Sequence, residues 1–141
     1  MDLFEQIITL SRQGFFCSQI LMQLGMAATG REDAALVRAM GGLCGGLGFT
    51  GKVCGCLTGG CCLLSYYLGK GEADETEQPE ARAAIAEFVR WFEERAKSEY
   101  GGDSCFAMTG NEPGRRLAVC PGLIADSYEK CMELLTERGA L

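Results

Sequence analysis

Apolar side chains recur at three- and four-residue intervals along almost the whole chain, and this periodicity restricts the fold more than any other feature. No stretch alternates between apolar and polar residues for long enough to predict a β-strand, and no hairpin turn signal is present. The spacing predicts helices over residues 2–12, 16–30, 33–40, 54–68, 79–99, 105–109 and 121–137. We therefore expect a single all-α domain over residues 1–141, a compact bundle of five to seven helices.

Glycine concentrates in one part of the chain. Residues 41–60 contain nine of the twenty glycines, which predicts a glycine-rich turn before a central buried helix. Gly51, Gly55 and Gly59 are four residues apart and would form a smooth strip on a helix. Because each glycine costs a helix about 1 kcal/mol relative to alanine, we expect the strip to admit another backbone or a cofactor.

Sulfur dominates the reactive side chains. The chain has nine cysteines and no histidine. Thiolates are nucleophiles, redox centres and soft metal ligands. The lack of histidine excludes an imidazole base, a histidine-ligated haem and a mixed Cys/His zinc site. Chemistry at any site must therefore run mostly on sulfur, with carboxylates and backbone amides in support.

Charge and hydropathy exclude two classes of partner. The net charge is −6 and no basic stripe is present, so we expect no binding to nucleic acid. Residues 1–13 have no basic leader and no small-residue cleavage site, which favours a cytoplasmic protein with reduced thiols. The uncharged stretch 53–68 is shorter than the roughly 20 residues of a spanning helix, so we expect no membrane span.

The densest run of cysteines, residues 54–62, does not form a metal site alone. On a helix, Cys54 and Cys61 share a face while Cys56 and Cys62 point elsewhere. Free cysteine also packs as a small hydrophobe. For Cys56 and Cys61 the sequence leaves packing and a role at a site equally open. Packing is the expected role of three cysteines in apolar or glycine-rich surroundings, Cys44, Cys62 and Cys131.

The remaining four cysteines fall at or just before the start of a predicted helix. The last of them precedes Pro121, and proline is favoured in the first helical turn. Unpaired N–H groups and the positive end of the helix dipole stabilise a thiolate and lower its pKa below about 8.5. These positions favour ligand or redox sulfur over inert core sulfur. The four are Cys17, Cys54, Cys105 and Cys120.

The same four cysteines give the chain a family resemblance. It resembles the C_GCAxxG_C_C family of small redox proteins, which have four characteristic cysteines. One position departs from the pattern, because Cys56 stands where the Cys-Gly-Ala core has alanine; reading Cys56 itself as the motif cysteine is the alternative to Cys54. The matching segments are Phe16-Cys17-Ser18-Gln19, the glycine-rich Gly41–Gly51, Cys54-Gly55-Cys56-Leu57-Thr58-Gly59, Cys105 and Cys120.

The resemblance implies a helical homodimer with a multi-cysteine redox or iron–sulfur site. A related domain is found in split-Soret cytochrome c proteins, which carry haem. This chain has no CxxCH motif and no histidine, so we expect no haem.

Three functions follow from these observations. The first is an iron–sulfur protein ([2Fe–2S] or [4Fe–4S]) that passes electrons to a redox partner protein, with zinc as the less favoured occupant. The second is a thiol–disulfide oxidoreductase or redox sensor in which Cys54 or Cys17 attacks. The third is a non-catalytic helical interaction module with packed cysteines.

The first of these functions assigns residues to the centre. The expected metal ligands are Cys17, Cys54, Cys105 and Cys120. The residues expected to lie against the cofactor are Gly51, Gly55, Gly59, Cys56 and Cys61.

Overall fold

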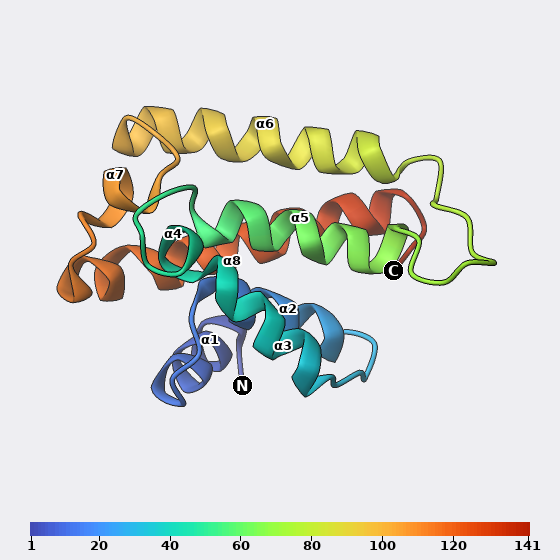
Figure 1. Cartoon of the computed structure of the whole chain (residues 1–141), viewed down its shortest axis with the longest axis horizontal. Coiled ribbons are helices and arrows are strands. Elements are labelled where there is room, and N and C mark those ends of the chain that lie inside the picture. Colours follow the sequence, from blue (N-terminus) through green and yellow to red (C-terminus); the bar gives the residue numbers. More distant parts are fainter.

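Seven α-helices and no β-strand make up the computed structural model, which describes all of residues 1–141 and confirms the all-α class (Figure 1). A short 3-10 turn, η1 (Gly41–Leu43), and a tight turn labelled α4 (Cys44–Leu47) connect the third helix to the next. The helices are α1 (Leu3–Arg12), α2 (Cys17–Ala27), α3 (Ala34–Met40), α5 (Gly55–Leu68), α6 (Ala81–Tyr100), α7 (Cys105–Thr109) and α8 (Pro113–Glu137).

Polar side chains fix where several helices begin. The Asp2 carboxylate accepts the Glu5 N–H at 2.8 Å, and the Glu5 carboxylate in turn accepts the Asp2 N–H. Asp33 caps α3 by accepting the Leu36 N–H, and Ser104 caps α7 by accepting the Ala107 N–H. Such a cap satisfies an otherwise unpaired amide and contributes about 1 kcal/mol.

Helix α5 lies at the centre of the bundle and contacts α2, α6 and α8. In Figure 1, α6 lies on one side of α5 and α1 to α3 lie on the other. Two glycines let its neighbours come close. A methyl group on Gly59 would lie 2.9 Å from Cα of Ser18 in α2, and one on Gly60 would overlap the Phe88 ring of α6. The predicted central buried helix is therefore present.

The predicted glycine strip is only partly helical. Gly51 lies outside α5, in the preceding loop, with a φ of +76°. The expectation that it shares a helical face with Gly55 and Gly59 is wrong, because α5 begins only at Gly55. The spacing predicted that either another backbone or a cofactor would lie against these glycines, and Gly59 does lie against another backbone, that of α2.

The last helix begins earlier than predicted, at Pro113 instead of near residue 121. Pro121 lies inside it, where its missing N–H leaves the Leu117 carbonyl without the usual helical partner. The helix continues past Pro121, which is buried together with Leu123 and Ile124. The expectation that Cys120 lies at a helix N-terminus is therefore wrong. No helix of the chain has the length and apolar character needed to cross a membrane.

Candidate functional site

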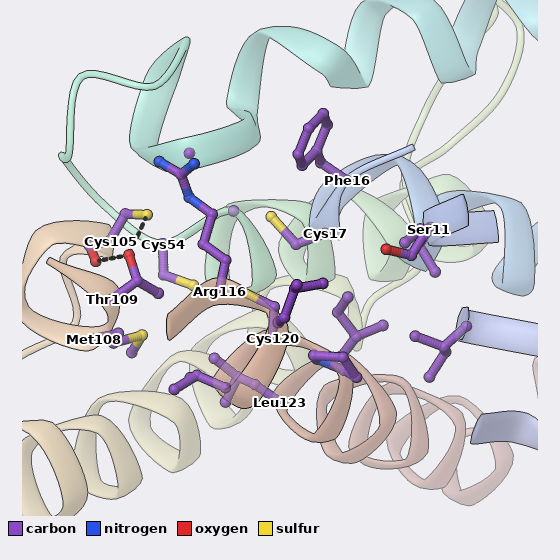
Figure 2. Close-up of a pocket in the computed structure, with 18 of the residues that line it drawn as sticks. Ser11, Phe16, Cys17, Cys54, Cys105, Met108, Thr109, Arg116, Cys120 and Leu123 are labelled. Carbon is purple, nitrogen blue, oxygen red and sulfur yellow. Dashed lines mark hydrogen bonds between the residues drawn. The ribbon is translucent and has the colours of Figure 1, made fainter. Parts of the chain in front are cut away.

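Four cysteines that are far apart in the sequence line one cavity of about 410 Å³. Figure 2 shows Cys17, Cys54, Cys105 and Cys120 on its walls, each delivered by a different helix or helix start. The rest of the lining is mostly apolar. This volume falls within the range of small-molecule and cofactor sites, roughly 300–1,000 Å³.

Cys54 and Cys105 are held beside each other by a short antiparallel pairing. Val53 and Ser104 form a β-bridge. The Cys54 N–H donates to the Asp103 carbonyl at 2.9 Å, and the Cys105 N–H donates to the Lys52 carbonyl at 2.7 Å. The first residues of α5 and α7 are therefore fixed relative to each other by backbone bonds.

Cys54 also caps α5, because its Sγ accepts the Cys56 N–H at 3.4 Å. Cys105 is the first residue of α7, and its Sγ lies 3.5 Å from the Thr109 hydroxyl. Cys17 is the first residue of α2. Three of the four cavity cysteines therefore occupy helix starts, as predicted for them.

A left-handed turn forms the cavity wall opposite α8. Residues 45–49 all have φ between 63° and 73°, a run that L-residues rarely adopt. Gly45 and Gly46 have no room for a side chain, because a methyl group would overlap the Phe49 ring and the Lys52 backbone respectively. Leu47 and Phe49 adopt this conformation despite their bulk, so the turn stores backbone strain beside the cavity.

Cys17 is the best stabilised thiolate at the site. The thiols of Cys44 and Cys56 donate to it, and the amides of Gly45 and Ser18 add further hydrogen bonds. Together they lower the pKa of Cys17 well below its ordinary value, although burial opposes the charge. The same contacts raise the pKa values of Cys44 and Cys56, which stay protonated as donors.

Cys44 is the residue that sequence reasoning missed at this site. It was expected to pack, and it is buried, but its thiol also faces Cys17 and lies 3.0 Å from the Ser18 hydroxyl. Ser18 in turn donates to the Met40 carbonyl at 2.8 Å. The signal was the pair of glycines directly after Cys44, which marks a left-handed turn that folds this cysteine back onto α2.

Cys120 differs from the other cavity cysteines in its electrostatics. Burial, and then electrostatic repulsion from the neighbouring sulfurs of Cys17, Cys54 and Cys105, raise its pKa to about 12. This thiol is therefore protonated at neutral pH unless a cation binds beside it.

Of the other expected site residues, only Gly55 lies at the cavity. Gly55 lines the cavity, and a methyl group on it would lie 2.5 Å from Sγ of Cys17. Gly51, Gly59, Cys56 and Cys61 do not line the cavity. Cys61 lies further along α5, where burial raises its pKa to about 11. As the side chains stand, no three Cys, Asp or Glu residues are placed to hold one metal ion, and all nine cysteines are free thiols.

A family model described as "Putative redox-active protein (C_GCAxxG_C_C)" matches residues 15–134. The chain belongs to this family. The C_GCAxxG_C_C match spans α2 through most of α8 and includes all four cavity cysteines. No curated protein and no solved structure matches the chain.

Proposed function

We propose that this protein binds an iron–sulfur cluster through the thiolates of Cys17, Cys54, Cys105 and Cys120 and transfers electrons. One observation carries the proposal. Four cysteines contributed by α2, α5, α7 and α8 line a single cavity of cofactor size. Four thiolates are the usual ligand set of two-iron and four-iron clusters.

The arrangement of the sulfurs favours a cluster over a single zinc ion. A zinc ion needs four ligands at about 2.3 Å from one point. No three sulfur or carboxylate groups stand that way, and the cysteines are spread over the cavity walls. A cluster would distribute the four thiolates over two or four iron atoms, so they need not converge on one point.

The chain supplies the environment that such a group requires. The amides of Ser18 and Gly45 donate toward the Cys17 sulfur and stabilise its thiolate form, and the Cys56 N–H donates to Sγ of Cys54. Apolar side chains such as Ile20 and Ile124 keep water from the inner wall of the cavity. An iron–sulfur cluster, when bound, supplies reversible one-electron chemistry.

Anaerobic purification followed by iron and acid-labile sulfide analysis tests this proposal. We expect both elements, visible absorption, and an EPR signal after reduction or oxidation. Replacing Cys105 or Cys120 by alanine should lower the iron content. Cys62→Ala is the matched control, because Cys62 lies on α5 outside the cavity. A colourless wild-type protein with neither iron nor sulfide would overturn the assignment.

A second function is favoured by the surroundings of Cys17, namely thiol–disulfide exchange. The Cys17 thiolate would attack a substrate disulfide, forming a mixed disulfide and releasing one substrate sulfur as a thiolate. Cys44 or Cys56, deprotonated as the first bond forms, would then attack Cys17 and release the second substrate sulfur. The protein loses two electrons to the substrate and gains an internal disulfide.

Mass spectrometry after exposure to oxidised glutathione checks this second function. A disulfide from Cys17 to Cys44 or Cys56 supports it, since both thiols donate to Cys17 in the reduced state. Glutathione found evenly on all cysteines would contradict it. The homodimer, the redox partner protein and the cytoplasmic location stay predictions.

A further inference from the structure

Arg116 is the only charged side chain that lines the cysteine cavity. It extends from α8 and, in the view of Figure 2, passes between Cys54 and Cys17. No carboxylate lines the cavity, although the chain as a whole has a net charge of −6. The cavity therefore combines apolar walls, sulfur and one fixed positive charge.

The guanidinium group of Arg116 is held in place by neighbours that leave part of it free. Its Nη2 donates to the Asn111 side-chain oxygen at 2.7 Å. Its central carbon lies 5.0 Å from the centre of the Phe49 ring, within the range of a cation–π contact. Both neighbours have left-handed backbone conformations, so the loops that present them have few alternatives. The positive group is therefore preorganised before any ligand arrives.

One donor of this group has no partner in the protein. Nε of Arg116 is buried and makes no hydrogen bond. None of the ion pairs in the structure involves Arg116. A buried charged donor left unpaired is costly, and native proteins keep few such groups. Because Arg116 lines the cavity and only its Nη2 donates to a protein acceptor, its unpaired charge points to an anion that enters the cavity.

We propose that the cysteine cavity is also an anion site, which binds a small carboxylate with an apolar body. The carboxylate pairs with the Arg116 guanidinium group, and the apolar body lies against exposed lining side chains such as Phe16 and Leu117. This site would hold the acid beside the sulfurs of Cys17 and Cys54. The inference does not depend on an iron–sulfur cluster, because it uses the arginine and the apolar wall and not the thiolates.

Binding of hexanoate and of hexanamide to the purified chain tests the proposal. The two probes share an apolar body and differ in charge. We expect ligand-observed NMR to detect hexanoate on the wild-type protein and to find hexanamide binding at least tenfold weaker, the usual effect of one charge-assisted hydrogen bond. Equal affinities of the wild-type protein for hexanoate and hexanamide would overturn the proposal, and so would the absence of binding of both.

Arg116→Gln should remove the preference for the acid, and Arg116→Lys should keep part of it. Arg115→Gln is the matched control, because Arg115 is exposed, lies outside the cavity lining and donates to the Met108 carbonyl. Retention of the full preference in the Arg116→Gln protein would refute the role of this arginine. Iron analysis of the same samples reports the cluster proposal separately, so the two can fail independently.

A second readout separates an anion site from a simple counter-ion. The charge of Arg116 also favours the thiolate of Cys120. A counter-ion role alone gives bound acid no means of shielding the cavity thiols, whereas an anion site predicts that hexanoate, and not hexanamide, slows the reaction of iodoacetamide at Cys17 and Cys54 of the reduced wild-type protein. Equal rates with the two compounds would assign Arg116 to the counter-ion role and overturn the proposal.

Discussion

Gly59→Ala tests whether the close packing of α2 on α5 sets the position of Cys17. A methyl group at residue 59 would lie 2.9 Å from Cα and 3.0 Å from Cβ of Ser18. The nearer atom belongs to the backbone and cannot rotate away, so α2 must move as a unit. Because Ser18 directly follows Cys17, this movement displaces the Cys17 sulfur from the cavity wall.

Two opposing effects set the change in the free energy of unfolding. Overpacking of a tight core contact costs about 1–3 kcal/mol. Alanine in a helix gains about 1 kcal/mol over glycine. We therefore expect a net loss of roughly 1 kcal/mol for Gly59→Ala.

Gly122→Ala isolates the packing effect. Gly122 lies within α8, is exposed, and has no neighbouring atom within 4 Å of an added methyl group. This variant should gain about 1 kcal/mol, since only helix propensity changes. The two variants should differ by about 2 kcal/mol, which for a chain of this size corresponds to roughly 4–8 °C in Tm.

Urea unfolding in reducing buffer, followed by far-UV circular dichroism and by the fluorescence of Trp91, measures both variants. We expect the midpoint of Gly59→Ala below wild type and that of Gly122→Ala above it. If the cluster is present, only Gly59→Ala should also lose iron. Equal midpoints for the two variants would show that α2 and α5 do not meet at Gly59, and the reasoning would be wrong.

Two further predictions concern the surroundings of Cys17. Iodoacetamide should modify Cys17 in the cluster-free protein before the other cysteines, and the rate at Cys17 should decline only as the pH falls through its lowered pKa. Cys120 should react slowly at neutral pH. Equal rates at the two cysteines, followed by mass spectrometry, would contradict this. Ser18→Ala should destabilise the chain by about 1–2 kcal/mol in urea unfolding, because Met40 and Cys44 lose their partner. Ser127→Ala is the control and should be neutral, since the buried Ser127 hydroxyl has no partner; equal losses would refute the interpretation.

The helices could be predicted because their signals are local. The apolar periodicity placed α1, α2, α3, α5 and α6 within a few residues of their observed bounds. The start of α8 was predicted wrongly, because a proline inside a helix and a proline in its first turn look alike in a sequence. Only the structure, in which Pro121 is buried within α8, distinguishes the two cases.

The candidate site was harder to predict, because its contacts join distant residues. The motif pointed to four cysteines, and the structure places all four on one cavity. Residue spacing could not predict that the Cys44 thiol faces Cys17. It also could not predict that Nε of Arg116 lacks a hydrogen-bond partner. Both depend on the left-handed turn at residues 45–49 and on the register of α8 against it.

The sequence by itself determined that this protein is helical and that its chemistry rests on sulfur, since periodicity and composition are properties of the chain read in order. Only the tertiary structure decided which thiols donate hydrogen bonds to Cys17 and that one arginine lines the cysteine cavity. Hydrogen bonding and charge act over a few ångströms in space, and the packing of α2, α5 and α8 sets those distances.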